Sequence, residues 1–378
     1  MSAHNHSKGP FPYKPGISRR NFLQVAGLAA AGAFLAGCKP KQEEVITPLI
    51  SGKGSGKTQA RVAIAKAKTY DRDLIDRQVS EMLDQLGGMS QVVKSGDTVA
   101  IKPNLTGGTS SAKVPGYSPV DSFVTHPEVV RALVKQVKSA GAKEIFIVES
   151  VYEWASYKDW GYETIAQDTG AKLIDLNDIK PFDKYDETTV KDNYIYPSFL
   201  FNKILNNIDV FMSVSKMKNH YNAGVTHTIK NNMGLVPYAF YRLNPGDSYR
   251  SAIHGQENET RQRLPRVLID LNRARPVNFS LIDGVMTAEA GEGPWIATFP
   301  PIQPGVLFAG INPVSTDAVA TAAMGFDPTS DYPNAPFIRG DNHLNLAYSK
   351  GLGTNRLDEI EVVGASIDEV RTQFHAAE

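Results

Sequence analysis

Apolar, β-branched segments of strand length alternate with segments of helical periodicity along most of the chain. In the second predicted helix the apolar residues lie on one stripe, Pro127 occupies the first position and Gly141 follows the last turn. The order strand, helix, strand, helix, strand is typical of a parallel sheet with crossover helices. These five elements are predicted at residues 61–65, 73–86, 98–101, 127–140 and 144–148.

The strand pattern continues to the end of the chain. Because the strands are continuously apolar, we expect a sheet that is buried on both faces. The sequence therefore predicts an α/β fold with a mostly parallel central sheet and helices on both faces. The later strands are predicted at residues 172–175, 210–214, 279–282, 306–309 and 360–363, and two further helices at 316–324 and 344–350.

Two segments interrupt this rhythm. Residues 152–197 are rich in Trp, Tyr and charge, and residues 238–263 are polar with Gly, Asn and Arg. Both are predicted to be insertions in a single α/β domain over residues 59–370. Long irregular segments in compact domains are often lids or binding loops, and the alternative is a surface excursion without function.

Composition excludes two classes of protein. The 378 residues are 42% hydrophobic and 21% charged, which is typical of a folded globular chain and excludes disorder for most of it. Forty basic residues balance forty acidic ones. No field of the whole protein would gather nucleic acid, so we expect no nucleic-acid partner.

The first 38 residues resemble an export signal. Residues 18–23 read Ser-Arg-Arg-Asn-Phe-Leu, the core of a twin-arginine signal, and the apolar stretch over residues 22–37 is too short to span a membrane. Residues 35–38 form a lipobox that ends in Cys38. We therefore predict export by the twin-arginine translocase and a lipid on Cys38 that anchors the protein at the periplasmic or cell-envelope side of a membrane. The alternative is a short membrane helix that ends in cysteine.

Residues 39–58 are predicted to be a flexible linker. They include Ser51 to Thr58, which read S-G-K-G-S-G-K-T and come close to a phosphate-binding P-loop. The motif fails because Ser51 stands where the first glycine is needed and a strand follows instead of a helix. Cys38 is the only cysteine, so the mature domain has no thiol for a disulfide, a nucleophile or an iron–sulfur cluster. Export in the folded state is often used for proteins that carry a cofactor, whose identity the sequence does not indicate.

Polar and ionisable residues follow four of the predicted strands at their carboxyl ends. In parallel α/β sheets this edge is where ligands bind, so we expect the four clusters to meet in one crevice. The start of the second helix, at Thr125 and His126, falls at the same edge. The clusters are Lys102, Pro103 and Asn104; Glu149 and Ser150; Lys216, Lys218, Asn219 and His220; and Asp283 and Gly284.

The charges in this set favour an anionic ligand. Together with Lys230, which follows further along the chain, Lys102, Lys216 and Lys218 give four lysines that would attract a phosphate or a carboxylate and repel a bare cation. We predict that His126 or His220 acts as acid and base with Glu149 or Asp283 as its partner. The predicted ligand-binding residues are Lys102, Asn104, Lys216, Lys218, Lys230 and Asn231.

Several of these residues also have simpler interpretations. Thr125 and His126 can be a helix cap, and Asp317 can cap a helix as readily as it can catalyse. We assign His227 and His254 to structure or surface, and residues 291–294 to a loop or a turn. Thr226 and Lys230 are expected on one helical face, since they are four residues apart.

Besides an enzyme or cofactor-dependent protein with an anion-binding crevice, two function classes remain open. One is a metal-dependent protein whose site is made by His126, His220 and carboxylates. This site would form only if its ligands outweighed the four lysines. The other class is a non-catalytic envelope lipoprotein that binds a partner.

Taken in order, these motifs resemble the family known as domain of unknown function 362. The similarity runs from about Val62 to Gly364. It implies a fold and a site rather than a reaction. Members are often fused to ferredoxin-type iron–sulfur segments, which implies redox surroundings, and this chain, with Cys38 alone, would need a redox partner. The motifs are Lys102, Pro103 and Asn104; Thr125 to Glu128; Gly141 and Ala142; Lys216 to His220; Lys230, Asn231 and Gly234; Asp283 and Gly284; and Asn312, Pro313 and Asp317.

Overall fold

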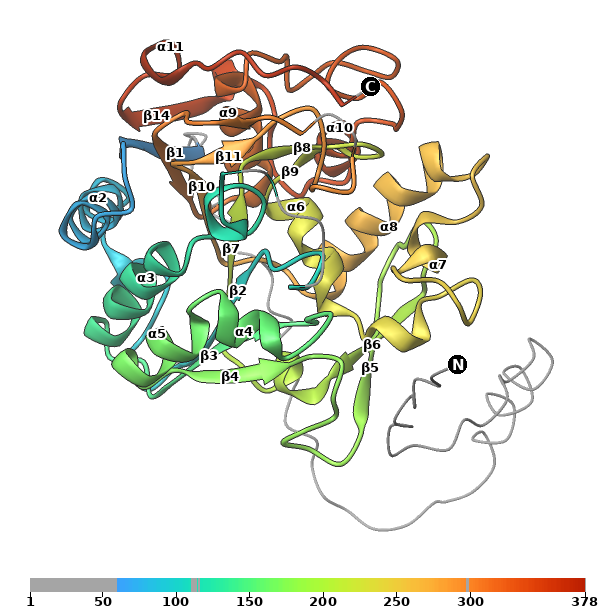
Figure 1. The fold of residues 1–378 in the computed structure, drawn as a ribbon, viewed down its shortest axis with the longest axis horizontal. Coiled ribbons are helices and arrows are strands. Elements are labelled where there is room, and N and C mark those ends of the chain that lie inside the picture. Colours follow the sequence, from blue (N-terminus) through green and yellow to red (C-terminus); the bar gives the residue numbers. More distant parts are fainter. Residues whose placement is uncertain (1–59, 110–113, 115, 297–298, 378) are drawn as a thin grey trace, which may run out of the picture. The chain divides into compact units, whose positions relative to one another are not determined.

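A twisted sheet of eight strands runs through the protein in the order β14-β1-β13-β10-β7-β2-β3-β4 (Figure 1). The computed structural model describes residues 60–109, 114, 116–296 and 299–377. Every neighbouring pair in the sheet is parallel except those of β13, which is antiparallel to both β1 and β10. The strands are β1 (Ala60–Lys66), β2 (Thr98–Pro103), β3 (Glu144–Glu149), β4 (Lys172–Asp175), β7 (Val210–Lys216), β10 (Phe279–Gly284), β13 (Val306–Gly310) and β14 (Ile360–Gly364).

Helices cover both faces of the sheet. Val99 and Ile101 of β2 pack in one apolar cluster with α2, α3 and α5, whereas Ala100 packs in a second cluster with α8 and α10. Figure 1 shows α2 and α3 to the left of the sheet and α8 to its right. The helices are α2 (Arg72–Gln85), α3 (Pro127–Ser139), α4 (Ala155–Asp159), α5 (Tyr162–Thr169), α6 (Thr228–Asn231), α7 (Ser251–His254), α8 (Thr260–Ala274), α9 (Pro313–Ala323), α10 (His343–Ser349) and α11 (Ile367–Val370).

The predicted fold class is confirmed, and each predicted strand of the sheet lies within one or two residues of its observed bounds. The helix α3 begins at Pro127 and ends before Gly141, whose φ of 92° lies in the region that favours glycine. The antiparallel direction of β13 was not predicted. An apolar strand looks the same in either direction, since only its connections set its orientation.

One local prediction is wrong. Thr226 and Lys230 do not share a helical face, because residues 224–226 form the strand β9 (Gly224–Thr226), which pairs with β8 (Lys218–His220). The helix α6 starts only at Thr228. The hairpin of β8 and β9 follows β7 directly and therefore lies at the carboxyl edge of the sheet.

The two segments expected as insertions differ from one another. Residues 152–197 contain α4, α5 and β4, and β4 is the last strand at one edge of the sheet. They also contain β5 (Tyr185–Thr189), which pairs with β6 (Ser198–Asn202). Residues 238–263 contain α7 and the start of α8. The remaining short strands are β11 (Thr287–Ala288) and β12 (Pro301–Ile302), which pair with each other.

The predicted signal peptide, the lipobox at Cys38 and the linker over residues 39–58 lie outside the described residues. Within the described residues, none of the helices combines the length and the apolar character that crossing a membrane requires.

The order of the strands creates one position where ligands are expected to bind. From β2 the chain moves outward through β3 to β4, and it then returns to place β7 on the other side of β2. In open α/β sheets the crevice beyond the carboxyl ends of the strands at such a reversal is the usual ligand site. At this position lie the carboxyl ends of β2, β3 and β7, with Lys102, Glu149 and Lys216.

Candidate functional site

A large cavity of about 1400 Å³ lies at the carboxyl ends of β2 and β3. Its walls come from the hairpin β8–β9, from α6, and from residues between Tyr238 and Arg261. Most of the predicted site residues line it, but His126, Lys216 and Asp283 lie outside its described lining. The predicted residues in the lining are Lys102, Asn104, Glu149, Lys218, His220, Lys230 and Asn231.

Lys102 and Glu149 form a buried ion pair at the floor of the cavity. The Lys102 Nζ lies 2.8 Å from Oε2 of Glu149, and the two side chains are 1% and 4% exposed. The Lys102 Nζ also donates to Oδ1 of Asn231 at 3.0 Å, which joins α6 to β2. The amide N–H groups of Leu105 and Ser150 donate to the same carboxylate. Burial lowers the pKa of Lys102 and the Glu149 carboxylate opposes this shift, so the pair satisfies itself and leaves no free charge.

Gly234 gives this ion pair its space. A Cβ at position 234 would collide with the carboxylate of Glu149 and would lie 2.7 Å from Nζ of Lys102. The main-chain oxygen of Gly234 also accepts a hydrogen bond from the Ser150 N–H at 3.1 Å. A residue with a side chain would therefore separate the two charged groups, which explains why glycine is needed here.

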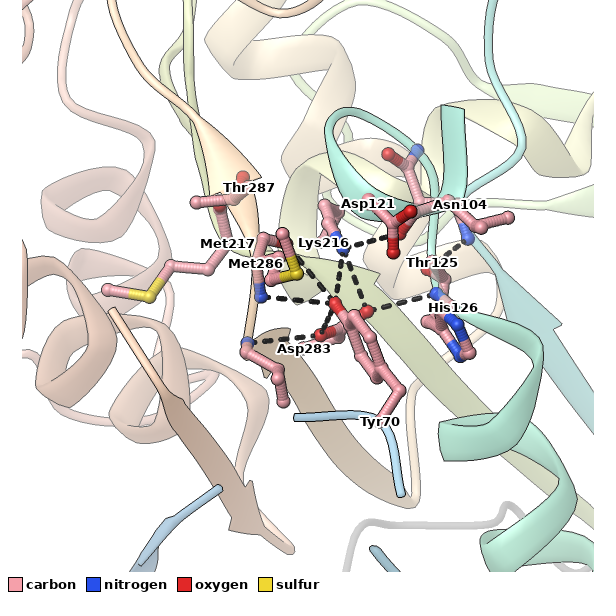
Figure 2. A network of polar contacts seen from close by, with 12 residues as sticks. Tyr70, Asn104, Asp121, Thr125, His126, Lys216, Met217, Asp283, Met286 and Thr287 are labelled. Atoms are coloured by element: carbon pink, nitrogen blue, oxygen red, sulfur yellow. Dashed lines mark hydrogen bonds and ion pairs between the residues drawn. The ribbon is translucent and has the colours of Figure 1, made fainter. Parts of the chain in front are cut away.

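Lys216 and Asp283 form a second buried ion pair outside the cavity (Figure 2). Their charged atoms are 3.0 Å apart and both side chains are 0% exposed. Tyr70 bridges them, since its hydroxyl donates to Oδ1 of Asp283 at 2.8 Å and accepts from Nζ of Lys216 at 2.8 Å. The main-chain N–H of His126 donates to Oδ2 of Asp283 at 2.9 Å. This network connects β7, β10 and the start of α3.

His126 is placed as a helix cap. Its Nδ1 accepts a hydrogen bond from the Glu128 N–H at 3.2 Å, and its ring stacks on Tyr70 with the centroids 3.6 Å apart. Burial lowers the pKa of His126 to about 4, although Asp283 opposes the shift. The ring is therefore neutral at physiological pH, and the geometry fits the capping interpretation rather than the catalytic one.

Lys218 and Lys230 line the cavity without a carboxylate partner among the residues that the structure describes. The Nζ of Lys218 donates to the main-chain oxygens of Phe123 at 2.8 Å and Glu292 at 2.5 Å. The Nζ of Lys230 donates to the thioether sulfur of Met233 at 3.1 Å. Burial lowers the pKa of Lys218 well below its usual value and that of Lys230 to about 8. An anion that binds beside either amine would raise its pKa again, because an opposite charge stabilises the protonated form.

His220 presents one ring nitrogen to the cavity. Its Nδ1 accepts hydrogen bonds from the N–H groups of Asn222 and Ala223, so the neutral ring carries its proton on Nε2. Burial, and next the charge of Lys230, lower the pKa of His220 well below 6.5. The ring is therefore a neutral donor rather than an acid that cycles near pH 7. Its neighbour His254 stacks beside it with the centroids 6.4 Å apart.

Several lining residues were given no binding role from the sequence. His254, which the sequence assigned to structure or surface, lies in the lining, as does Glu292 of the loop interpreted as a turn. Arg250 also lines the cavity, and its guanidinium donates to the main-chain oxygens of Val236 and Ser150 at 3.1 Å each. The only signal for Arg250 and His254 was their place in a long polar segment. The spacing of residues in such a segment carries no periodicity that would indicate which side chains turn inward.

Contacts also decide the roles of Asp317 and of the histidines considered as metal ligands. Asp317 lies within α9, and its carboxylate accepts the N–H groups of Thr228 at 2.9 Å and Ile229 at 2.8 Å, so it holds the first turn of α6. Asn312 caps α9 itself. Among the described residues, no group of three or more His, Cys, Asp or Glu side chains is arranged to hold a metal ion. His126 and His220 belong to different networks and cannot share one.

Residues 99–322, which run from β2 to α9, match a known family described as a domain of unknown function (DUF362). The match covers more than half of the chain. The chain belongs to the DUF362 family. The matched region contains both ion pairs and all four lysines of the sheet edge.

A thylakoid-associated protein of Synechocystis sp. is 25% identical to this DUF362 chain over 270 residues, which are 71% of this chain and 76% of that protein. Two solved structures are more distant. The lactate racemase apoprotein of Thermoanaerobacterium thermosaccharolyticum is 15% identical with a TM-score of 0.34, over 65% of this chain and 54% of that one. A protein of Thermotoga maritima is 9% identical with a TM-score of 0.32, over 63% and 55%. The match spans about half the length of each structure.

Gly234→Ala tests whether the Lys102–Glu149 pair depends on this glycine. We expect the free energy of unfolding to fall by about 3 kcal/mol, because the methyl group separates two buried charges. Chemical denaturation measures it. Gly246→Ala is the matched control, since a Cβ there meets no atom within 4 Å and should change stability little. Equal effects of the two substitutions would contradict the assignment.

Tyr70→Phe tests the second ion pair. Removal of the hydroxyl leaves Lys216 and Asp283 each without one hydrogen-bond partner, so the free energy of unfolding should fall by about 2 kcal/mol. Tyr117→Phe, at a residue that is 41% exposed, is the control for loss of a tyrosine hydroxyl. A Tyr70→Phe protein as stable as the control would rule out this role.

Proposed function

We propose that the protein binds a small anionic compound in the cavity at the carboxyl ends of β2 and β3, and that this cavity is where it functions. One observation carries the proposal. Of the four lysines at this edge, Lys102 and Lys216 are neutralised by Glu149 and Asp283, whereas the hydrogen-bond partners of Lys218 and Lys230 in the described part of the chain are neutral.

The energetics of burial support a missing counter-charge. A buried ammonium group is stable in the charged form only when it is paired or well hydrogen-bonded. Main-chain oxygens and a thioether sulfur stabilise it less than a carboxylate does. A carboxylate or phosphate from a ligand would supply the charge that Lys218 and Lys230 lack, and Arg250 would add a third cation.

Two acidic residues of the cavity wall, Glu292 and Asp247, are engaged in other hydrogen bonds, although the charge of Glu292 raises the pKa of Lys218 and of Lys230 and so partly balances them. The Glu292 carboxylate accepts hydrogen bonds from the Tyr221 N–H at 2.9 Å and from the Trp295 indole at 3.2 Å. Asp247 accepts from the Asn244 N–H at 2.9 Å. These carboxylates hold the loops of the wall in place, and neither forms an ion pair with Lys218 or Lys230 within the part of the chain that the structure describes.

His220 fits a role in orienting the ligand. With Nδ1 occupied by two main-chain N–H groups, its Nε2–H is the ring donor that can reach a ligand oxygen. A neutral imidazole that polarises an oxygen is an established catalytic device. We retain the interpretation that the cavity supports a reaction and assign His220 as a hydrogen-bond donor in place of the acid and base expected from the sequence.

The location of the protein is a separate part of the proposal. The twin-arginine pattern of residues 18–23 and the lipobox that ends at Cys38 support an exported, lipid-anchored protein. An anchored domain at the envelope would meet ligands outside the cytoplasm. The expected redox partner likewise stays a prediction, which rests on the family resemblance.

Lys218→Met and Lys230→Met test the anion site. Each substitution removes a charge at nearly constant length, so we expect the affinity for oxalate or sulfate, measured by titration calorimetry, to fall about tenfold or more. Lys158→Met, at an exposed residue of α4, is the control and should bind as the native protein does. Native affinity in both cavity variants, with the fold intact by circular dichroism, would refute the proposal.

The pH dependence of oxalate binding tests the same site independently. The charge of oxalate is constant above pH 6, whereas Lys230, with its pKa lowered to about 8 by burial, loses its proton as the pH rises. The affinity should therefore decrease, by about tenfold between pH 7 and pH 9. The charges that also act on Lys230 are those of Glu292, Arg250, Lys102 and Glu149.

Lys230→Arg is the matched control, because a guanidinium keeps its charge over this range. It should reduce the decrease in affinity and leave only the part that comes from Lys218. An affinity that stays constant in the native protein from pH 7 to pH 9 would contradict the assignment of Lys230.

A further inference from the structure

We propose that Lys230 is a nucleophile that forms an imine with its ligand, so that the anion bound in the cavity is a small aldehyde or ketone that carries a carboxylate or a phosphate. This inference rests on the proposed anion site and names the class of compound that the site takes.

The position of Lys230 is the first argument. It is the third residue of the short helix α6, and the Asp317 carboxylate fixes the first turn of that helix through two N–H groups. Asn231, the next residue, is tied to the Lys102–Glu149 pair. The backbone that carries the amine is therefore held on both sides, while Nζ itself reaches the cavity and donates to the sulfur of Met233.

Comparison with the other lysines of the edge singles out Lys230. Lys102 is held by Glu149 and Asn231, and Lys216 lies outside the cavity. Lys218 donates to two main-chain oxygens and is 1% exposed, whereas Lys230 is 8% exposed. A thioether is a weak acceptor, so the nitrogen of Lys230 can turn toward a substrate at small cost.

The surroundings of Lys230 increase the fraction of the neutral amine, which is the reactive form, above that of an exposed lysine. Burial is the main cause that lowers the pKa of Lys230 to about 8; the positive charges of Arg250 and Lys102 add to it, and the carboxylates of Glu292 and Glu149 oppose it. A lysine made nucleophilic by desolvation and by neighbouring cations is a recurrent way to activate an amine for Schiff-base formation. Its charged and titratable neighbours are Glu292, Arg250, Lys102, Glu149, Lys218, His220, His254 and His343.

The other cavity groups supply what such a substrate needs. Arg250 is a cation for the carboxylate or phosphate end, and Lys218, whose pKa burial lowers well below its usual value, gains its proton when that anion binds beside it. The Nε2–H of His220 is a neutral donor for the carbonyl oxygen, and its hydrogen bond makes the carbonyl carbon more electrophilic.

The step balances without another reactant. The lone pair of Nζ attacks the carbonyl carbon, the electron pair of the C=O bond moves to the oxygen, and the two protons of the amine end on that oxygen by way of solvent. The oxygen then leaves as water, and a C=N bond joins the lysine to the substrate. No oxidant or reductant is consumed.

Reductive trapping tests the inference. The purified full-length chain is incubated at pH 8 with glyoxylate and sodium cyanoborohydride, which delivers hydride to an imine and fixes it as a secondary amine. We expect peptide mass spectrometry to find the reduced adduct on Lys230 about tenfold or more faster than on the exposed Lys158. Oxalate should compete and slow the trapping at Lys230 only.

Lys230→Arg is the decisive variant, because it keeps the positive charge and removes the primary amine. It should bind oxalate within a few-fold of the native protein and lose the adduct. Glyoxylate that modifies exposed lysines as fast as Lys230 would overturn the inference. In the native protein, absence of the adduct together with normal oxalate binding would overturn it as well, and would leave the anion site intact. Absence of both trapping and oxalate binding there would overturn the inference and the proposed function together.

Discussion

The buried ion pair between Lys102 and Glu149 determines how the floor of the cavity is built. It joins the carboxyl ends of β2 and β3, and through Asn231 it also positions α6. Two charges can be buried here only if they meet at hydrogen-bond distance, because separating them in a region with little water would cost several kcal/mol. The close approach in turn requires Gly234, which has no Cβ to intrude between them. The parallel sheet makes this pairing possible, since β2 and β3 are adjacent and their carboxyl ends meet.

The strands of the sheet and the bounds of α3 were predictable from the sequence, because both depend on residues that are close together in the chain. The strands appear as short apolar runs, and α3 is marked by Pro127 and Gly141 at its ends. The rule that carboxyl ends converge predicted one crevice for all four clusters; Lys102, Glu149, Lys218 and His220 line one cavity, whereas Asp283 lies outside its lining. Two features were not predictable: the direction of β13, and which of the lysines would pair with a carboxylate. Both depend on which strands are neighbours, and the order of the strands is set by contacts between residues far apart in the sequence.

The residues of segment 238–263 were unpredictable for a different reason. Tyr249, Arg250 and His254 line the cavity, but they lie around the short helix α7, where no repeat of apolar residues indicates the inner face. Irregular segments held on a rigid scaffold commonly carry binding residues for this reason, because their shape is set by individual contacts. Here the contacts include the two hydrogen bonds of Arg250 to main-chain oxygens.

The division of the lysines also explains why the two without a carboxylate partner in the described structure lie where they do. A lysine that is enclosed by protein on all sides, as Lys216 is, needs a carboxylate from the protein itself, because no counter-charge from outside can reach it. Lys218 and Lys230 border a cavity large enough for water and for a ligand, so a counter-charge can arrive from outside. The fold can therefore keep two incompletely satisfied amines at this place, and their position is the part of the sheet edge where we propose that a ligand binds.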